Sequence, residues 1–285
     1  MQLADTQFGY ASGTEDLAYE DRIARAAVAH INRLRPRFVI ITGDLVDAWP
    51  GDPRREAQLA RFRQIFGAID RDIPLLYVSG NHDTGTPANR DRIETFRRDF
   101  GPDSYTFWAG GAKCIVLNTE LLRKPGDAES LAATQRRFLE IELGAAAAER
   151  PRHLFIFQHH PWFVDAESEP DSYFNMPEAL RREMLPQLLR AGVRAIFAGH
   201  LHRNQDTRSG PMEMITTGPI SLPAPSREQG PYPGVRSGMT IVRVFSDRID
   251  HRFHALDPNE VPDRIRMEEE RDVASAQGAK VPVVQ

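Results

Sequence analysis

The chain has 285 residues, enough to bury a large core without disulfides, and its single cysteine excludes both an intrachain disulfide and a thiolate zinc site. A formal net charge of −4, with both signs spread along the chain, excludes a basic stripe for nucleic acid and a polybasic membrane patch. No apolar run is long enough to span a bilayer and no signal peptide is recognisable, so we expect a cytoplasmic protein without nucleic-acid or membrane partners.

The chain opens with a very short strand before Asp5, which leaves open whether the native protein begins further upstream. A helix is expected over residues 15–34, where Ile23 and Ile31 belong to one apolar face and Pro36 ends the pattern. Further helices are expected over residues 54–70, 90–99, 130–143 and 177–191. Apolar runs predict further strands over residues 37–44, 73–81, 104–110, 112–120, 152–160, 193–200, 212–218, 238–245 and 248–256.

Alternating strands and helices predict an α/β fold, and the final three strands, with no helix between them, predict that the sheet is mixed. Cys114 lies within an apolar strand pattern and is expected to pack in the core. We expect one domain over residues 1–257, followed over residues 258–285 by a polar extension, partly helical or disordered. The Pro- and Gly-rich stretch before Gly238 is expected to be a surface loop, with an interdomain linker as the alternative, and is a candidate cover for a cleft.

Metal-capable side chains follow the strands at the points where the strands end. They are Asp5, Asp44 and Asp47 in GDLVD, Asn81 and His82 in GNHD, His159 in HHP, and His200 and His202 in GHLH. Carboxyl ends of parallel strands share one edge of a sheet, and mixed oxygen and nitrogen ligands suit first-row divalent ions. Glycines precede three of these residues and are expected to let the backbone turn sharply.

Each piece taken alone has an ordinary structural reading. A Gly-Asp pair after a strand is commonly a turn, a lone His pair is as often surface as site, and Asp47 is also a candidate helix N-cap. Their recurrence at successive strand ends favours one metal site over unrelated turns.

The set of motifs, in this order, resembles the calcineurin-like metallophosphoesterase superfamily, whose pattern runs D-x-H, G-D-x-x-D, G-N-H-[DE], a strand ending in H, then G-H-x-H. Here the first motif is Asp5-Thr6-Gln7, and the match extends to His202. The chain is most similar to the calcineurin-like phosphoesterase domain-containing branch, one animal member of which is described as a serine/threonine phosphatase. ADTQFG, VSGNHDTG, FQHHPWF, DSYFNMP and AGHLHRN carry that similarity, and Gln7 resembles a feature of this branch.

The resemblance implies a sandwich of two mixed β-sheets flanked by helices, with the site at the carboxyl ends of the strands. It also implies two divalent metal ions, chosen from Mn, Fe, Zn and Mg. Asp44 would bridge them, Asp5, Gln7 and His202 would belong to the first site, and Asn81, His159 and His200 to the second. Because an amide oxygen is a weaker ligand than imidazole, we expect the first site to favour manganese or magnesium over zinc. His160, beside His159, is expected to pack next to the site or to support a metal ligand without binding the metal itself.

By the same resemblance, a metal-bridging hydroxide would attack phosphorus in line with the leaving group. His82 would protonate or stabilise that group, and Asp47 would orient His82. Candidate substrate-binding residues are Arg203, Asn204, Asn118, Tyr173 and Asn175. Trp49 is expected to be core or cleft wall.

The leading hypothesis is a phosphomonoesterase acting on phosphoserine, phosphothreonine or a small phosphate ester, so that the partner is a phosphorylated small molecule or a phosphoprotein. The alternative enzyme is a phosphodiesterase of the cyclic-nucleotide type, which Asp83 in the GNHD motif supports. A third possibility is a catalytically silent metal-binding scaffold.

Overall fold

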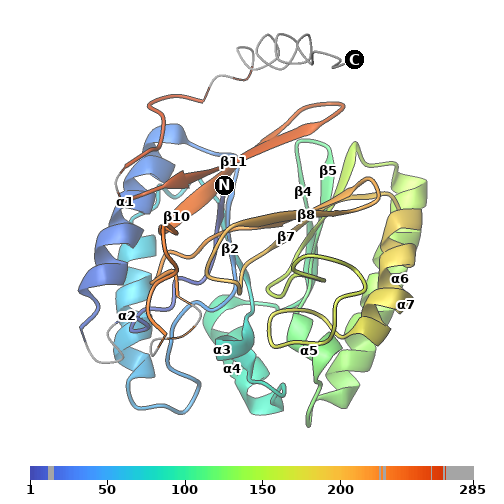
Figure 1. Cartoon of the computed structure of the whole chain (residues 1–285), viewed down its shortest axis with the longest axis horizontal. Coiled ribbons are helices and arrows are strands. Elements are labelled where there is room, and N and C mark those ends of the chain that lie inside the picture. Colours follow the sequence, from blue (N-terminus) through green and yellow to red (C-terminus); the bar gives the residue numbers. More distant parts are fainter. Residues whose placement is uncertain (12–15, 225, 227–228, 258, 266, 268–285) are drawn as a thin grey trace, which may run out of the picture.

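The computed structural model describes residues 1–11, 16–224, 226, 229–257, 259–265 and 267. Two sheets face each other in the middle of the molecule (Figure 1). The first contains, in spatial order, β11 (Ile249–Ala255), β10 (Gly238–Val244), β1 (Gln2–Leu3), β2 (Val39–Thr42) and β3 (Leu75–Val78). The second contains β4 (Tyr105–Ala109), β5 (Ala112–Val116), β6 (His153–Phe157), β7 (Val193–Ala198), β9 (Met212–Thr216) and β8 (Gln205–Ser209).

Both sheets are mixed, as the sequence predicted. In the first, β1, β2 and β3 are parallel and the late strands β10 and β11 pair antiparallel. In the second, β5, β6, β7 and β9 are parallel and the two edge strands are antiparallel. Parallel strands therefore form one side of the first sheet and the centre of the second, and their carboxyl ends define the edge where polar side chains can gather.

Helices cover the outer faces of both sheets (Figure 1). The apolar faces of α1 (Ala18–Leu34) and α2 (Arg55–Phe66) pack on the first sheet, and those of α6 (Glu129–Glu149) and α7 (Glu178–Arg190) pack on the second. The remaining helices are α3 (Asn81–Thr84), α4 (Arg90–Phe100) and α5 (Thr119–Arg123). The predicted α/β sandwich is thus confirmed.

A third apolar cluster lies between the sheets. Ile40 and Val78 of the first sheet meet Val116, Phe157 and Phe197 of the second. The rings of Phe157 and Phe197 stack with centroids 4.8 Å apart. Because β2 and β3 of the first sheet and β6 and β7 of the second all run on into candidate ligands, this cluster sets the position of one half of the site against the other.

Cys114 is buried in the same cluster and free, and burial raises the pKa of its thiol to about 12. Its predicted packing role is confirmed.

Three short elements were missed. Strand β8 is polar and lies at a sheet edge, so it carries no apolar pattern. Helices α3 and α5 are single turns that begin directly after strands, and the strand predicted over residues 112–120 ends at Val116. The C-terminal prediction falls largely on residues 268–285, outside the described part of the chain. Within the described residues, no helix is both long and apolar enough to cross a membrane.

Candidate metal centre

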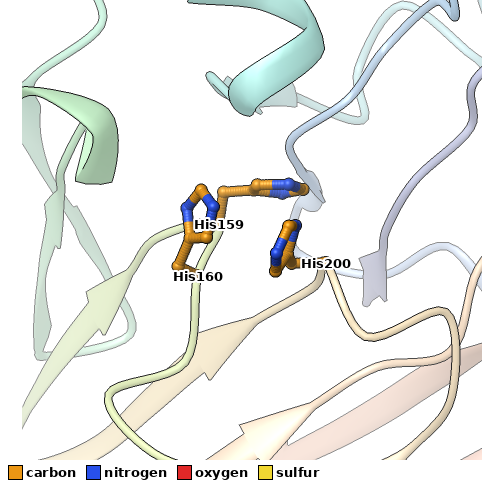
Figure 2. A group of neighbouring side chains, drawn as sticks. All are labelled: His159, His160 and His200. Carbon is orange, nitrogen blue, oxygen red and sulfur yellow. The ribbon is translucent and has the colours of Figure 1, made fainter. Parts of the chain in front are cut away.

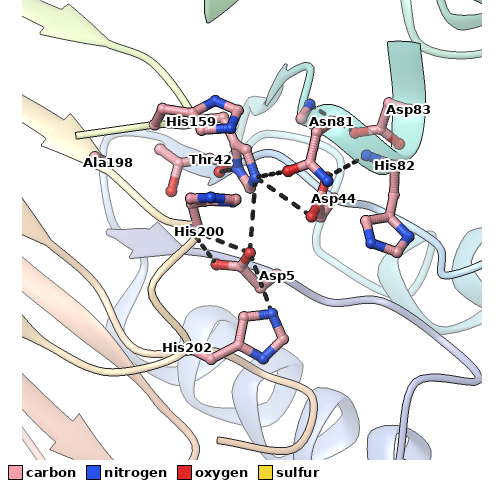
Figure 3. A network of polar contacts seen from close by, with 12 residues as sticks. Asp5, Thr42, Asp44, Asn81, His82, Asp83, His159, Ala198, His200 and His202 are labelled. Carbon is pink, nitrogen blue, oxygen red and sulfur yellow. Dashed lines mark hydrogen bonds and ion pairs between the residues drawn. The ribbon is translucent and has the colours of Figure 1, made fainter. Parts of the chain in front are cut away.

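The loops after β1, β2, β3, β6 and β7 bring the predicted ligands together at one edge of the two sheets (Figure 3). His159 Nε2 lies 3.1 Å from Asn81 Oδ1, 3.3 Å from Asp44 Oδ2 and 4.0 Å from Asp5 Oδ1. His202 Nε2 lies 3.6 Å from Asp5 Oδ1. All of these side chains are buried. Residues separated by up to about two hundred positions thus converge on one small volume.

Backbone strain is concentrated at these residues. Among the described residues, seven non-glycine residues have positive φ, and two of them, Arg35 and Arg150, end helices α1 and α6. The other five are Asp5, Gln7, Asp44, His200 and His202. Such conformations cost on the order of 1–3 kcal/mol each and persist where the surroundings impose them, commonly at functional sites. The strained backbone therefore occurs at residues that the sequence motifs indicated as candidate ligands.

The glycines beside the ligands have two different roles. Gly43 has a φ of +90°, so it makes the sharp turn that the sequence predicted. Gly80 and Gly199 do not have positive φ; an added Cβ would lie 2.1 Å from Asp44 Oδ1 and 2.7 Å from Asp5 Oδ2, respectively. For these two the turn explanation is wrong, because what they provide is space for a carboxylate.

Hydrogen bonds to backbone carbonyls orient three of the histidine rings. His159 Nδ1 lies 2.8 Å from Thr42 O and His202 Nδ1 lies 2.9 Å from Leu222 O. His200 Nε2 lies 3.0 Å from Tyr173 O. Because a carbonyl can only accept, each of these nitrogens must donate, which leaves the other ring nitrogen as the candidate metal donor.

Burial and close contacts set the charge state of each group in the cluster. Burial raises the pKa of Asp5 to about 8. Burial lowers the pKa of His202 to about 4 and that of His200 well below its usual value, so both rings are neutral and able to bind metal. Burial also opposes a charge on His159, but the adjacent Asp44 outweighs it and raises the pKa of His159 to about 9. The same pairing holds the pKa of Asp44 below its usual value against the effect of burial.

His159 Nε2 faces oxygens of Asp5, Asp44 and Asn81. A proton on this nitrogen bonds to the nearest of them, and a metal ion in its place would be shared by all three. Gln7 Oε1 is buried among the same groups without a hydrogen-bond partner. Gln7 lines a cavity of about 30 Å³ with Asp44 and His200, a size suited to ions and water. The donor set and the unpartnered amide oxygen fit a divalent metal centre.

His82 lies beside this group and does not point into it (Figure 3). Its Nδ1 lies 2.8 Å from the backbone oxygen of Asp47 and 3.8 Å from the Asp47 carboxylate. The predicted pairing with Asp47 is therefore made mainly through the main chain. Its backbone N–H donates to Asp44 Oδ1 at 2.8 Å, which ties the loop of His82 to the predicted bridging carboxylate.

His160 lies near His159 and His200, with ring centroids 5.0 and 4.0 Å away (Figure 2). Its ligand atoms lie close enough to theirs to share an ion. However, its Nδ1 lies 2.8 Å from Thr119 Oγ1 and its Nε2 accepts from Arg123 Nη1 at 3.0 Å. Both ring nitrogens are engaged, so we assign His160 a role in supporting the neighbouring candidate ligands, in line with the prediction.

The substrate-side candidates divide into two groups. Tyr173 accepts a hydrogen bond from Asn81 Nδ2 at 3.2 Å, and its ring lies 4.7 Å from that of His200, at the mouth of the site. Arg203 and Asn204 follow the last ligand and are partly or fully exposed. Asn118 caps α5 and Asn175 binds Glu169, and both are buried. These last two side chains are thus committed to loop structure.

Sequence reasoning missed several supporting groups. The carbonyls of Thr42, Tyr173 and Leu222 leave no trace in a sequence, because every residue has one. Arg123 donates to Glu120, to His160 and to Tyr173 O, and only its place one turn into a helix after a strand could have drawn attention to it. The Pro-rich loop does reach the site, because Leu222 O holds His202 and Ala224 lines the cavity; residues 225 and 227–228 lie outside the described part.

Comparison with known proteins agrees with this geometry. Residues 1–204 match the family model described as calcineurin-like phosphoesterase. A Mus musculus protein named serine/threonine-protein phosphatase CPPED1 is 34% identical over 268 residues, which cover 90% of this chain and 83% of the relative. A probable cyclic nucleotide phosphodiesterase of Rhodopseudomonas palustris is 32% identical over 196 residues, 62% of each chain.

Among solved structures, a dimetal phosphatase from Danio rerio aligns with a TM-score of 0.56 at 17% identity, covering 78% of this chain and 88% of its own. This likeness supports the fold. The family model and the CPPED1 relative, together with the grouped ligands, lead to one conclusion. The chain belongs to the calcineurin-like phosphoesterase family and is a metal-dependent hydrolase of phosphate esters.

Proposed function

We propose that residues 1–257 act as a single catalytic domain of a cytoplasmic phosphomonoesterase. Its substrates would be phosphoserine or phosphothreonine in a phosphoprotein, or a small phosphate ester. The observation that carries this proposal is the convergence of buried carboxylate, amide and imidazole donors on one point with His82 beside them. The relative named as a serine/threonine-protein phosphatase supports the choice of substrate.

Asp44, Asp5 and His202 would hold one ion with Gln7, and Asn81, His159 and His200 would hold the second with Asp44. Two bound divalent ions would supply Lewis acidity and an activated water. The side chains of the protein would supply the other functions. Asn81 and Tyr173 are hydrogen-bonded to each other at the mouth of the site, and His82 would give a proton to the departing oxygen. Tyr173, Arg203 and Asn204 are the side chains we propose for substrate contact.

A diesterase of the cyclic-nucleotide type is the second candidate, supported by the bacterial relative with that name. Asp83, which favoured this alternative in the sequence, accepts from Gly80 N at 2.8 Å and lies near Leu45 N, 3.3 Å away. It therefore ties two ligand loops together, and this internal role accounts for an acidic residue at that position without reference to a substrate.

The test is to strip the protein with chelator, restore manganese, and compare p-nitrophenyl phosphate with bis-p-nitrophenyl phosphate. We expect a clear preference for the monoester, followed by turnover of phosphopeptides. A preference for the diester would replace the monoesterase proposal, and absence of turnover on both substrates and on phosphopeptides would favour the scaffold.

Metal choice is tested at Gln7. We propose manganese as the favoured ion, because an amide oxygen binds zinc less well than an imidazole does. Gln7→His should increase zinc retained after chelator dialysis, measured by elemental analysis, and Gln7→Ala should not. Two tightly held zinc ions in the unaltered protein would contradict the manganese preference.

A further inference from the structure

The indole of Trp49 covers the imidazole of His82. Their ring centroids lie 5.1 Å apart with an interplanar angle of 30°. Trp49 is two residues beyond Asp47, whose carbonyl accepts from His82 Nδ1. The same loop therefore contacts His82 twice, once through a hydrogen bond in the plane of the ring and once through the ring face.

Arg92 holds the indole from another element. Its guanidinium lies 4.7 Å from the centroid of the Trp49 ring, within the range of a cation–π contact. Arg92 belongs to the first turn of α4, and its backbone N–H donates to Asn89 Oδ1, the N-cap of that helix, at 3.1 Å. The start of α4 thus provides a fixed support for the indole that lies against the imidazole of His82.

The backbone of the Trp49 loop is anchored as well. Ala48 N donates to Gln58 Oε1 at 2.8 Å, and Ala48 O accepts from Arg55 Nη1 at 3.0 Å. Gln58 and Arg55 belong to α2 and are buried. With Ala48 held on both sides, neither the Asp47 carbonyl nor the backbone that carries Trp49 can shift without breaking buried hydrogen bonds, and Arg92 holds the indole itself.

We propose that Trp49, clamped by Arg92, is a positioning residue that sets the orientation of His82 for proton donation to the leaving group. The inference rests on the proposed phosphomonoesterase function. In the step concerned, water oxygen bonds to phosphorus and releases one proton to solvent, and the bond from phosphorus to the ester oxygen breaks. The electron pair stays on that oxygen, which takes the proton of His82 Nε2, while Nδ1 keeps its bond to Asp47 O. The neutral imidazole then regains a proton from solvent.

Proton donation matters most when the leaving oxygen is basic, so the inference is tested by comparing two leaving groups. Phenyl phosphate has a poorer leaving group than p-nitrophenyl phosphate. In the manganese-loaded protein, Trp49→Ala should lower kcat for phenyl phosphate by about 10- to 100-fold, less than the roughly 10²- to 10⁴-fold that general acid catalysis contributes, and kcat for p-nitrophenyl phosphate by less than about 3-fold. KM should change little for either.

Conservative variants sharpen the test. Trp49→Phe keeps an aromatic face and should restore most of the rate on phenyl phosphate. Arg92→Met should give a smaller loss of the same selective kind, and Arg92→Lys should recover part of it. Trp108→Ala, at an exposed tryptophan of edge strand β4, is the matched control and should leave both rates unchanged. Equal losses on the two substrates in Trp49→Ala, or no loss, would overturn the inference.

A readout independent of turnover separates this inference from the proposed function. The His82 Hε1 resonance, identified by its absence in His82→Gln, should shift in Trp49→Ala because the ring current of the indole is removed, and should stay in place in Trp108→Ala. If the resonance does not move, the stack does not hold His82 and the inference is wrong, whatever the rates. If the unaltered protein shows the shift relative to Trp49→Ala yet hydrolyses neither monoester, the proposed function fails, and proton donation by His82 fails with it.

Discussion

The two sheets contribute different chemistry to the same centre. The first sheet supplies oxygen donors, Asp5, Asp44 and Asn81, from the ends of β1, β2 and β3, and the second supplies imidazoles, His159, His200 and His202, after β6 and β7. The oxygen loops are bonded to each other, since Asp5 N donates to Gly43 O and Gln7 N to Asp44 O.

The imidazoles, by contrast, depend on partners outside their own strands. His159 is aimed by Thr42 O of the first sheet, and His200 by the loop of Tyr173. The oxygen half of the site, Asp5, Asp44 and Asn81, is therefore largely organised by one sheet. The nitrogen half, the three histidines, is organised only when the sheets and loops have packed.

Removing the shared carboxylate should have the largest effect. Asp44→Asn takes away a charge that both halves contact, through His159 and through the backbone of His82. We expect kcat/KM to fall by at least on the order of 10³-fold, comparable to the loss of a key electrostatic contact in a buried site. Asp72→Asn, at an exposed aspartate paired with Arg35, should retain full activity. Unchanged turnover in Asp44→Asn would remove Asp44 from the centre.

Weakening the packing between the two sheets, which we call the seam, should have the second-largest effect. Phe157→Ala removes a buried ring of the cluster between the sheets, which includes Ile40 and Val78 of the first sheet, and should lower the free energy of unfolding by about 3–5 kcal/mol. Ile141→Ala, at an exposed residue of α6, should change it by less than about 0.5 kcal/mol. Thermal unfolding measures both. If the comparison is right, metal affinity in Phe157→Ala falls too; normal affinity in a destabilised protein would show that the nitrogen half does not need the seam.

Loosening the clamp on the Tyr173 loop should have a moderate effect. Arg123 Nη2 donates to Tyr173 O, the carbonyl that also aims His200. Arg123→Ala should weaken metal binding by about 10- to 100-fold, the usual range for a partner of a ligand, as measured by titration with manganese. Arg123→Lys should restore part of this loss. Arg136→Ala, in an exposed pair on α6, is the control, and equal affinities in Arg123→Ala and Arg136→Ala would contradict the assignment.

The last expected effect needs no substitution and is a dependence of metal affinity on pH. The pKa of His159 is raised to about 9 and that of Asp5 to about 8, so both hold protons at neutral pH that a metal must displace. Affinity should therefore fall as pH is lowered from about 9 to about 6, by up to about tenfold per pH unit for each proton displaced.

Calorimetry in buffers of different ionisation enthalpy would count the protons released. His159→Gln should bind more weakly but with a flatter pH profile. An affinity independent of pH over this window would show that the cluster is not protonated as its contacts indicate.

Much of the fold and most of the ligand set could be predicted because their signals are local. Ile23 and Ile31 show the helical period of α1, and Asp44, Asn81, His159 and His200 each follow an apolar run, so their shared edge follows from strand direction alone. What could not be predicted depends on groups without a sequence signature. Strand β8 lacks an apolar pattern. For the substrate-side candidates Asn118 and Asn175, the sequence does not distinguish an exposed asparagine from one that caps a helix or holds a loop.

The residue pattern alone was thus enough to predict the order of the longer elements, the candidate ligand side chains and the resemblance to the family. Only the tertiary structure decided which nitrogen of each histidine faces the centre, because that choice belongs to the carbonyls of Thr42, Tyr173 and Leu222. It also decided that Gly80 serves a carboxylate and not a turn, and that Trp49 covers His82. The physical reason is that backbone acceptors and close approaches are properties of packed chains, which no local pattern of side chains encodes.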